Sequence, residues 1–128
     1  VQRIGGVLLL AQMSSRGNLL DQKYTKETIE TGKGSPHVIG YIGNGSSPQE
    51  IEQLREIVGA GQMIWTPGIN LNTEAGKMGQ RYGTPRESIV SGADIIIVGS
   101  GIHGQEDRVG AAKAYAEASW NAILERGK

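Results

Sequence analysis

The residues best suited to chemistry form a glycine-rich stretch, Gly99-Ser-Gly-Ile-His-Gly104, between an apolar run and an expected helix. Its G-x-G-x-x-G spacing is typical of turns whose backbone N–H groups approach a phosphate, because glycine has no side chain to block that approach. A dinucleotide site would also need a further strand and an acid about 20 residues later, whereas the residues up to Lys128 have a helical pattern. The stretch therefore predicts a simple phosphate site, with a ligand-free strand-to-helix turn as the alternative.

A second group of candidates lies in the polar stretch between Gly68 and Thr84. Gln80, Arg81 and Tyr82 offer an amide, a guanidinium and a phenol, which together suit a phosphate. Loops of this length often grip ligands. Ordinary loop polarity is the alternative interpretation.

The remaining titratable candidates are weaker. His103 lies in the glycine-rich stretch and could touch a bound phosphate, although a lone histidine is more often a surface residue. Asp21, Lys23 and Lys26 place an acid beside two lysines, as a catalytic charge array does. Because they open an expected helix and do not end a strand, we interpret them as a solvated first turn with Asp21 near the helix N-terminus.

The composition argues against several classes of function. The chain has no cysteine and two histidines, so we expect neither a thiolate site nor a zinc site made of histidines alone. Its 13 Lys and Arg residues balance 13 Asp and Glu residues, which argues against nucleic acid and membrane surfaces as partners. The longest apolar run, Val7 to Ala11, is too short to cross a bilayer, and no signal peptide is recognisable. We expect a cytoplasmic protein.

Short apolar runs alternate with helical patterns along the chain. The runs do not alternate apolar with polar residues, which is typical of parallel strands buried on both faces. A cap residue followed by proline marks expected helix starts at Ser47 and Thr84, and Gly59 and Gly92 are the expected stops. The expected strands are Val7–Ala11, Val38–Ile42, Met63–Thr66 and Asp94–Val98, and two further helices are expected over Thr25–Thr31, ending at Gly32 and Gly34, and over Glu106–Glu125.

Trp65 and Trp120 are expected in the core. Trp65 lies within an expected strand, and Trp120 belongs to an apolar stripe on the last helix. That stripe contains Val109, Ala112, Tyr115, Ala116, Ser119, Trp120 and Ile123.

The strand–helix order, repeated four times, predicts an α/β fold with parallel strands in one domain over residues 1–128. Either a small open sheet or half of a (β/α)8 barrel would satisfy this order. In both, the polar segments that follow the strands meet at one edge of the sheet. Their hydroxyls, amides and backbone N–H groups suit binding of a polar anionic small molecule and not proton transfer. The segments are Ser14-Ser15, Gly43–Ser47, Pro67–Asn72 and Gly99–Gly104.

Several separated segments resemble orotidine 5'-phosphate decarboxylase of the eukaryotic type, as in the decarboxylase domain of uridine monophosphate synthase. They are Leu8–Leu19, Tyr24-Thr25, Trp65–Gly68, Gly79–Tyr82 and Ser91–Ile102. The resemblance covers essentially the whole chain and implies the carboxyl-terminal half of a (β/α)8 TIM barrel, strands five to eight. It also implies a homodimeric, cofactor-free carboxy-lyase that converts orotidine monophosphate to uridine monophosphate and CO2 in pyrimidine synthesis.

The resemblance also implies roles for individual residues near the base. Ser14 resembles the serine that hydrogen-bonds the pyrimidine edge, and Pro67 the proline near the base. Gln80 resembles the loop glutamine that spans the base and the phosphate.

The implied phosphate contacts come from Tyr82 and from the turn Gly99, Ser100 and Gly101, whose backbone amides would face the phosphate. Position 100 departs from the family, which normally has an arginine there. Loss of that forked, charge-assisted contact would cost roughly 1.5–3 kcal/mol of binding.

The family's catalytic Asp-x-Lys-x-x-Asp motif is a second departure, since it belongs to the first four strands and does not occur in this sequence. In the family, a lysine beside the substrate stabilises and protonates the carbanion that decarboxylation leaves. We therefore expect this chain to supply the binding contacts and to be inactive alone. Because four strands leave sheet edges open, the expected partner is the missing amino-terminal half-barrel or a second copy of the chain.

Two other interpretations stay open. One is a non-catalytic half-barrel scaffold that binds a phosphate or nucleotide. The other is a different phosphate-binding barrel, such as those of tryptophan or histidine synthesis, against which the Gly79–Tyr82 segment argues.

Overall fold

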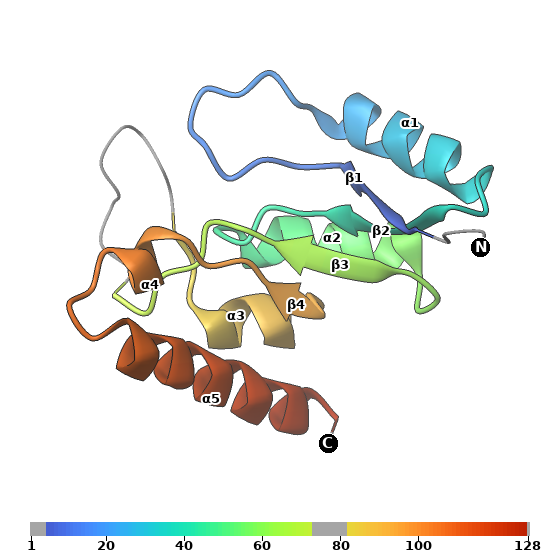
Figure 1. The fold of residues 1–128 in the computed structure, drawn as a ribbon. Helices are drawn as coiled ribbons and strands as arrows, with labels where there is room; N and C mark the ends of the chain where they lie inside the picture. The colour runs from blue at the N-terminus through green and yellow to red at the C-terminus, as the bar shows by residue number, and fades with distance from the viewer. Residues whose placement is uncertain (1–4, 73–81, 128) are drawn as a thin grey trace.

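The computed structural model describes residues 5–72 and 82–127. Its four strands form one parallel sheet in the order β1-β2-β3-β4, with helices between successive strands (Figure 1). This confirms the predicted α/β order. The elements are β1 (Val7–Leu10), α1 (Gln22–Lys33), β2 (Val38–Ile42), α2 (Pro48–Val58), β3 (Met63–Thr66), α3 (Pro85–Val90), β4 (Ile95–Ile96), α4 (Ser100–His103) and α5 (Arg108–Arg126).

The core lies between the sheet and the helices. Tyr41 of β2 and Ile64 of β3 pair in register and are almost fully buried, and Leu9 of β1 pairs with Tyr41 on the same face. They pack against α1 and α2 through residues such as Ile29 and Leu54. Burying each such side chain contributes about 1.5–3 kcal/mol, so this face fixes the sheet against its helices.

An irregular register in the first strand pair sets which face of β2 points to the core. Val7 pairs with Val38 and Leu8 pairs with Gly40, so β2 has one extra residue, Ile39, opposite β1. The extra residue lets both Val38 and Tyr41 reach the core, although their spacing in a regular strand would put them on opposite faces. Ile39 is left 41% exposed.

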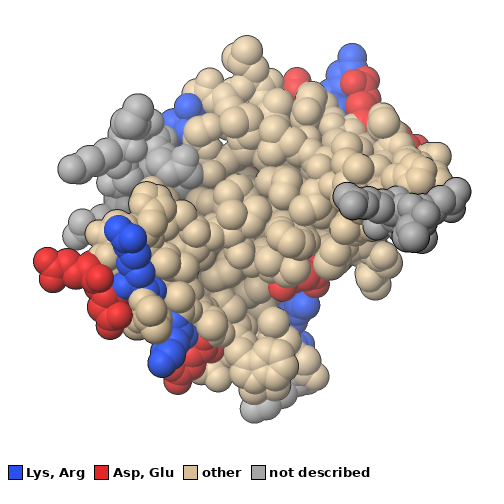
Figure 2. Space-filling model, in the orientation of Figure 1, with Lys and Arg blue, Asp and Glu red and all other residues tan. Residues whose placement is uncertain are grey.

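The opposite face of the sheet has its own row of apolar side chains. Leu10, Ile42, Trp65 and Ile95 are register partners across all four strands. None of them is fully buried, and Leu10 is 41% exposed. The space-filling view, in the same orientation as the ribbon, has few charged side chains over its centre (Figure 2). We call Leu10, Ile42, Trp65 and Ile95 the apolar row.

Helix starts follow the sequence signals where a cap residue precedes proline. Ser47 accepts a hydrogen bond from the Glu50 backbone N–H, and Thr84 forms a capping box with Glu87. The predicted bounds of α1 were wrong at both ends. It begins after Asp21, which accepts a hydrogen bond from the Tyr24 N–H at 2.8 Å. This confirms Asp21 as part of a first helical turn.

At its other end, α1 continues through Gly32 to a cap at Gly34. Gly32 lies inside the helix, and the Tyr41 phenol occupies the space that a side chain would need. A Cβ on Gly32 would stand 2.1 Å from the Tyr41 hydroxyl oxygen. Glycine therefore serves close packing here and does not end the helix.

The predicted apolar stripe on α5 was rotated relative to the observed one. Tyr115 and Ala122 are buried, whereas Trp120 is 60% exposed and Val109 is 68% exposed, which corrects the expectation that Trp120 lies in the core. Arg126 follows Ala122 by four residues, on the same side of the helix, and donates to the carbonyl oxygens of Ile89 and Ala93. These contacts tie this side of α5 to the end of α3 and the residues that follow it.

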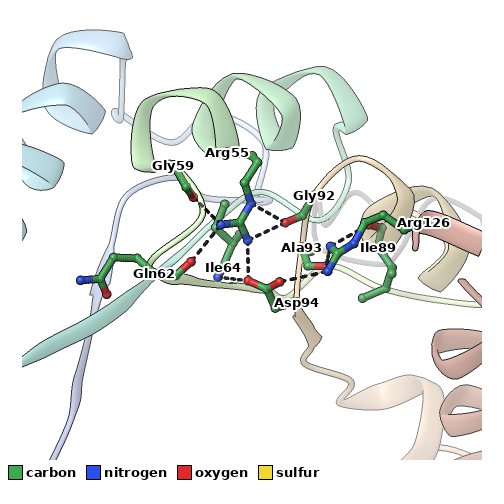
Figure 3. A network of polar contacts seen from close by, with 9 residues as sticks. All are labelled: Arg55, Gly59, Gln62, Ile64, Ile89, Gly92, Ala93, Asp94 and Arg126. Atoms are coloured by element: carbon green, nitrogen blue, oxygen red, sulfur yellow. Dashed lines mark hydrogen bonds and ion pairs between the residues drawn. The ribbon is translucent and has the colours of Figure 1, made fainter. Parts of the chain in front are cut away.

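A cluster of two arginines and one aspartate joins α2, α5 and the start of β4 at the end of the sheet opposite α4 (Figure 3). Arg55 donates to the carbonyl oxygens of Gly59, Gln62 and Gly92 and to the Asp94 carboxylate. Asp94 also accepts from the Ile64 N–H at 2.9 Å and from Arg126 at 3.1 Å. We call Arg55, Asp94 and Arg126 the arginine clamp.

The short strand β4 was predicted as longer, over Asp94–Val98. Only Ile95 and Ile96 form the strand, but the Asp94 N–H donates to the Ile64 carbonyl and the Ile97 N–H to the Thr66 carbonyl on either side.

Within the described ranges, no helix is long and apolar enough to cross a membrane.

Candidate functional site

The loops that follow the four strands gather at one end of the sheet, together with α4 (Figure 1). Parallel α/β sheets bind their ligands at this end, because all strand ends and following helix starts converge there. The segments directly after the strands are 11–15, 43–47, 67–72 and 97–101, and none of them contains Asp, Glu, Lys, Arg or His. This end of the described structure therefore offers hydrogen-bonding groups without a charged side chain in those segments.

Two of the predicted phosphate-site residues are in contact. The Tyr82 hydroxyl lies 3.3 Å from the Ser100 hydroxyl, and either oxygen could be the donor. Ser100 and Gly99 are exposed and Tyr82 is partly exposed, so both hydroxyls remain accessible to a ligand. Gly101 is buried beneath them. The structure thus brings together residues that lie 18 positions apart in sequence.

Three backbone segments pack directly against one another beside this pair. The Gly83 N–H donates to the Gly68 carbonyl at 2.8 Å, and the Asn70 N–H donates to the Gly83 carbonyl at 2.9 Å. The Gly45 N–H donates to the Pro67 carbonyl at 3.1 Å. A Cβ on Gly83 would lie 2.2 Å from the Gly45 carbonyl oxygen, so only glycine fits this position. The loop after β2, the loop after β3 and the residue after Tyr82 are held in one arrangement.

A buried amide network supports the loops after β1 and β2. Asn44 is fully buried; its N–H donates to the Gln12 side chain at 2.9 Å, and its amide donates to the Glu50 carboxylate at 2.6 Å. Gln12 also donates to the Glu50 carbonyl oxygen at 2.9 Å. Buried polar groups that are this fully paired hold one conformation. Sequence reasoning missed this network, because nothing local indicates that residues 32 positions apart would pair.

The other predicted site residues stand as follows. Ser14 lies just after β1, at the opposite edge of the sheet from β4, and is 6% exposed. Pro67 directly follows β3 and contacts the loop after β2 through its carbonyl group. Gln80 falls in 73–81, outside the described residues. His103 is exposed at the end of α4, and its ring lies 3.8 Å from where a Cβ on Gly99 would stand.

A cavity of about 800 Å³ lies between α1, α2 and the loop after β1. Gln12, Asp21, Lys26 and Glu50 are among its lining residues, whereas Tyr82 and Ser100 are not. Among the described residues, no group of three or more His, Asp or Glu side chains is arranged to hold a metal ion.

Comparison with known proteins identifies what the chain is similar to. The family model described as orotidine 5'-phosphate decarboxylase / HUMPS family matches residues 2–115. The orotidine 5'-phosphate decarboxylase of Phycomyces blakesleeanus is 43% identical over 124 residues, which are 94% of this chain and 44% of that protein. The corresponding protein of Pichia kudriavzevii is 40% identical over 125 residues, 96% of this chain and 45% of that protein. The chain spans less than half the length of these curated relatives.

Solved structures of orotidine 5'-phosphate decarboxylases are also similar to this chain. The orotidine 5'-phosphate decarboxylase of Pyrococcus horikoshii superposes with a TM-score of 0.71 at 28% identity, over 90% of this chain and 51% of that one. The decarboxylase of Sulfolobus solfataricus also gives a TM-score of 0.71 over 92% of this chain and 50% of that one, at 23% identity, which speaks for the fold alone. The four parallel strands therefore correspond to half of a TIM barrel. The chain belongs to the orotidine 5'-phosphate decarboxylase / HUMPS family.

Proposed function

We propose that this chain supplies the base and phosphate contacts of an orotidine 5'-phosphate decarboxylase, which forms uridine monophosphate and CO2. The observation that carries the proposal is the contact between Tyr82 and Ser100 at the carboxyl ends of the strands. Two accessible hydroxyls beside a glycine turn can each donate to a phosphate oxygen. In the proposed assignment, Gly99 and Gly101 let the backbone approach the same phosphate.

The base contacts form the second part of the proposal. Ser14 would hydrogen-bond the pyrimidine edge and Pro67 would lie near the ring, with Gln80 between base and phosphate. Binding energy from a remote phosphate can contribute to the chemical step only where a reacting centre is aligned with it.

The reacting centre itself needs charged groups. Decarboxylation breaks the bond between C6 of the pyrimidine and its carboxylate carbon; the electron pair stays on C6, CO2 leaves, and C6 then takes up a proton. A cation near C6 would stabilise the carbanion and donate that proton. Segments 11–15, 43–47, 67–72 and 97–101 contain no lysine, histidine or acid. In the proposal, the charged groups come from the first four strands of the barrel.

The apolar row gives the physical reason for a partner. Leu10, Ile42, Trp65 and Ile95 lie on the face of the sheet away from the helices, and the Trp65 indole N–H is buried without a hydrogen-bond partner in the described structure. Covering this row with further strands would bury apolar area at about 25 cal/mol per Å². We propose that the first four strands of the barrel cover it, on the same polypeptide or another; a second copy of this chain is the alternative cover.

A non-catalytic half-barrel that binds a phosphate or nucleotide is the second candidate. The absence of charged side chains from the strand-end segments favours it. Both candidates predict binding of uridine monophosphate, and only the decarboxylase predicts turnover after the first half is added.

Binding can be tested on the chain alone by titrating uridine monophosphate and uridine and following amide chemical shifts by nuclear magnetic resonance. We expect shifts at Ser100 and Gly101 with uridine monophosphate and weaker binding of uridine. Tyr82→Phe should weaken binding of uridine monophosphate and leave binding of uridine unchanged. Tyr24→Phe, at a 40% exposed tyrosine on α1, should change the affinity for neither ligand. Equal affinity for both ligands, or shifts confined to other residues, would contradict the assigned phosphate contacts.

A further inference from the structure

Tyr115 of α5 reaches the strand-end loops from below, although it lies outside every segment that the sequence singled out as a site. It is 5% exposed. Its hydroxyl accepts a hydrogen bond from the Leu71 N–H at 3.0 Å and lies 3.5 Å from the Asn70 side-chain oxygen, to which it donates. The hydroxyl therefore holds the segment that continues from β3.

The same hydroxyl packs against the glycine turn. A Cβ on Gly101 would lie 2.3 Å from the Tyr115 hydroxyl oxygen and 3.2 Å from a methyl carbon of Val98. Such a Cβ distance does not occur in folded proteins, so Gly101 is needed for the turn to rest on this oxygen. One buried oxygen thus contacts both the segment after β3 and the turn that contains Ser100.

These contacts form a closed ring. From Tyr115 the ring passes to Leu71 and Asn70, and the Asn70 N–H donates to Gly83, the residue next to Tyr82. Tyr82 contacts Ser100, and Ser100 is followed by Gly101, which rests on Tyr115. Every step is a direct contact or a chain neighbour, so the Tyr115 hydroxyl is linked to Tyr82 on one side and to Ser100 on the other.

We infer that Tyr115 is a positioning residue for the phosphate contacts: its buried hydroxyl sets the spacing between Tyr82 and the Gly99–Gly101 turn. The inference rests on the proposed function. Tyr115 does not touch the ligand itself, since it is buried beneath the turn. Its effect is therefore on binding of the phosphate group and not on binding of the nucleoside.

The test compares Tyr115→Phe with Tyr41→Phe. Each variant keeps the ring and removes one buried hydroxyl; that of Tyr41 donates to the Ile29 carbonyl oxygen at 3.2 Å, within the core beneath α1. One hydrogen bond is worth about 0.5–1.5 kcal/mol, so we expect Tyr115→Phe to weaken binding of uridine monophosphate about two- to twelvefold. Uridine affinity should stay unchanged. Tyr41→Phe should lower the free energy of unfolding by the worth of one buried hydrogen bond and leave the affinities for uridine monophosphate and uridine unchanged.

Amide hydrogen exchange gives a second measurement that needs no ligand. Loss of the acceptor accelerates exchange at Leu71 directly. The inference requires faster exchange also at Gly83, which follows Asn70 in the ring and whose own N–H donates to the Gly68 carbonyl oxygen. Equal loss of nucleotide affinity in both variants, or unchanged exchange at Gly83, would overturn the inference. If the wild-type chain binds no uridine monophosphate, the proposed function fails, and exchange at Gly83 still decides whether Tyr115 sets this geometry.

Discussion

Replacing Arg55 with lysine tests whether the arginine clamp stabilises the fold through its geometry or through its charge. The Arg55 guanidinium makes five hydrogen bonds, to three carbonyl oxygens and the Asp94 carboxylate. A lysine ammonium keeps the positive charge but has three donors and no planar fork. Arg55→Lys therefore loses at least two hydrogen bonds and leaves carbonyl groups at the ends of α2 and α3 without their partner.

At about 1 kcal/mol for each net hydrogen bond, we expect Arg55→Lys to lower the free energy of unfolding by about 2 kcal/mol. The ion pair with Asp94 is left out of this sum, since both side chains are about a quarter exposed (24% and 29%) and the charge remains. An unfolding entropy of about 2.1 cal/mol/K per residue converts the loss to a fall of about 7 °C in Tm. Urea denaturation followed by circular dichroism measures the same quantity at 25 °C.

Arg86→Lys is the matched control. Arg86 also forms a forked contact with a carboxylate, that of Glu125, which raises the pKa of the Arg86 guanidinium through the hydrogen bond and then through its charge. Its side chain is 63% exposed, so this variant should leave the urea midpoint unchanged. The reasoning is refuted if Arg55→Lys is no less stable than Arg86→Lys, or if 1 M salt abolishes the difference, since salt screens charge and not hydrogen-bond geometry.

Three further predictions follow from the structure. Ser100→Arg, at an exposed position beside Tyr82, should tighten uridine monophosphate binding by about 1.5–3 kcal/mol in calorimetry by adding a forked contact to phosphate; unchanged affinity contradicts the assigned turn. Gly83→Ala should lower the free energy of unfolding by about 1–3 kcal/mol and weaken binding of uridine monophosphate. Gly61→Ala, with open space around its Cβ, should change neither stability nor affinity in the same assays. Burial, and after it the negative charge of Glu30, raises the pKa of the Tyr41 phenol above 10.0. The stability that the neutral phenol contributes is therefore complete below pH 10 and is lost as pH rises further. In urea titrations, Tyr41→Phe should reduce the fall in unfolding free energy at alkaline pH.

Continuous apolar runs predicted the strands because parallel strands with helices on one side and further cover on the other leave few polar positions. The cap-plus-proline signals predicted α2 and α3 because their contacts are local, within three residues. The prediction was wrong for Trp120, since the inward side of α5 is held by long-range contacts of Tyr115 and Arg126 that no local pattern contains.

The candidate site divides in the same way. The glycine turn was recognisable because close approach of backbone to a ligand or to another element has a local signature. The contribution of Tyr115 was not, because its hydroxyl acts on Leu71, 44 residues away in sequence, and its position in an apolar stripe predicts only burial. The roles of Ser14, Pro67 and Gln80 toward a base stay predictions.

The most direct test of the central claim measures release of CO2 from orotidine monophosphate by this chain, by the first four strands of the Phycomyces blakesleeanus relative, and by the two together. The account predicts no turnover by either polypeptide alone and turnover when they are mixed, with Tyr82→Phe in this chain raising KM. Turnover by this chain alone at the rate of the mixture would contradict it. So would a stable complex of the two, seen by light scattering, that releases no CO2.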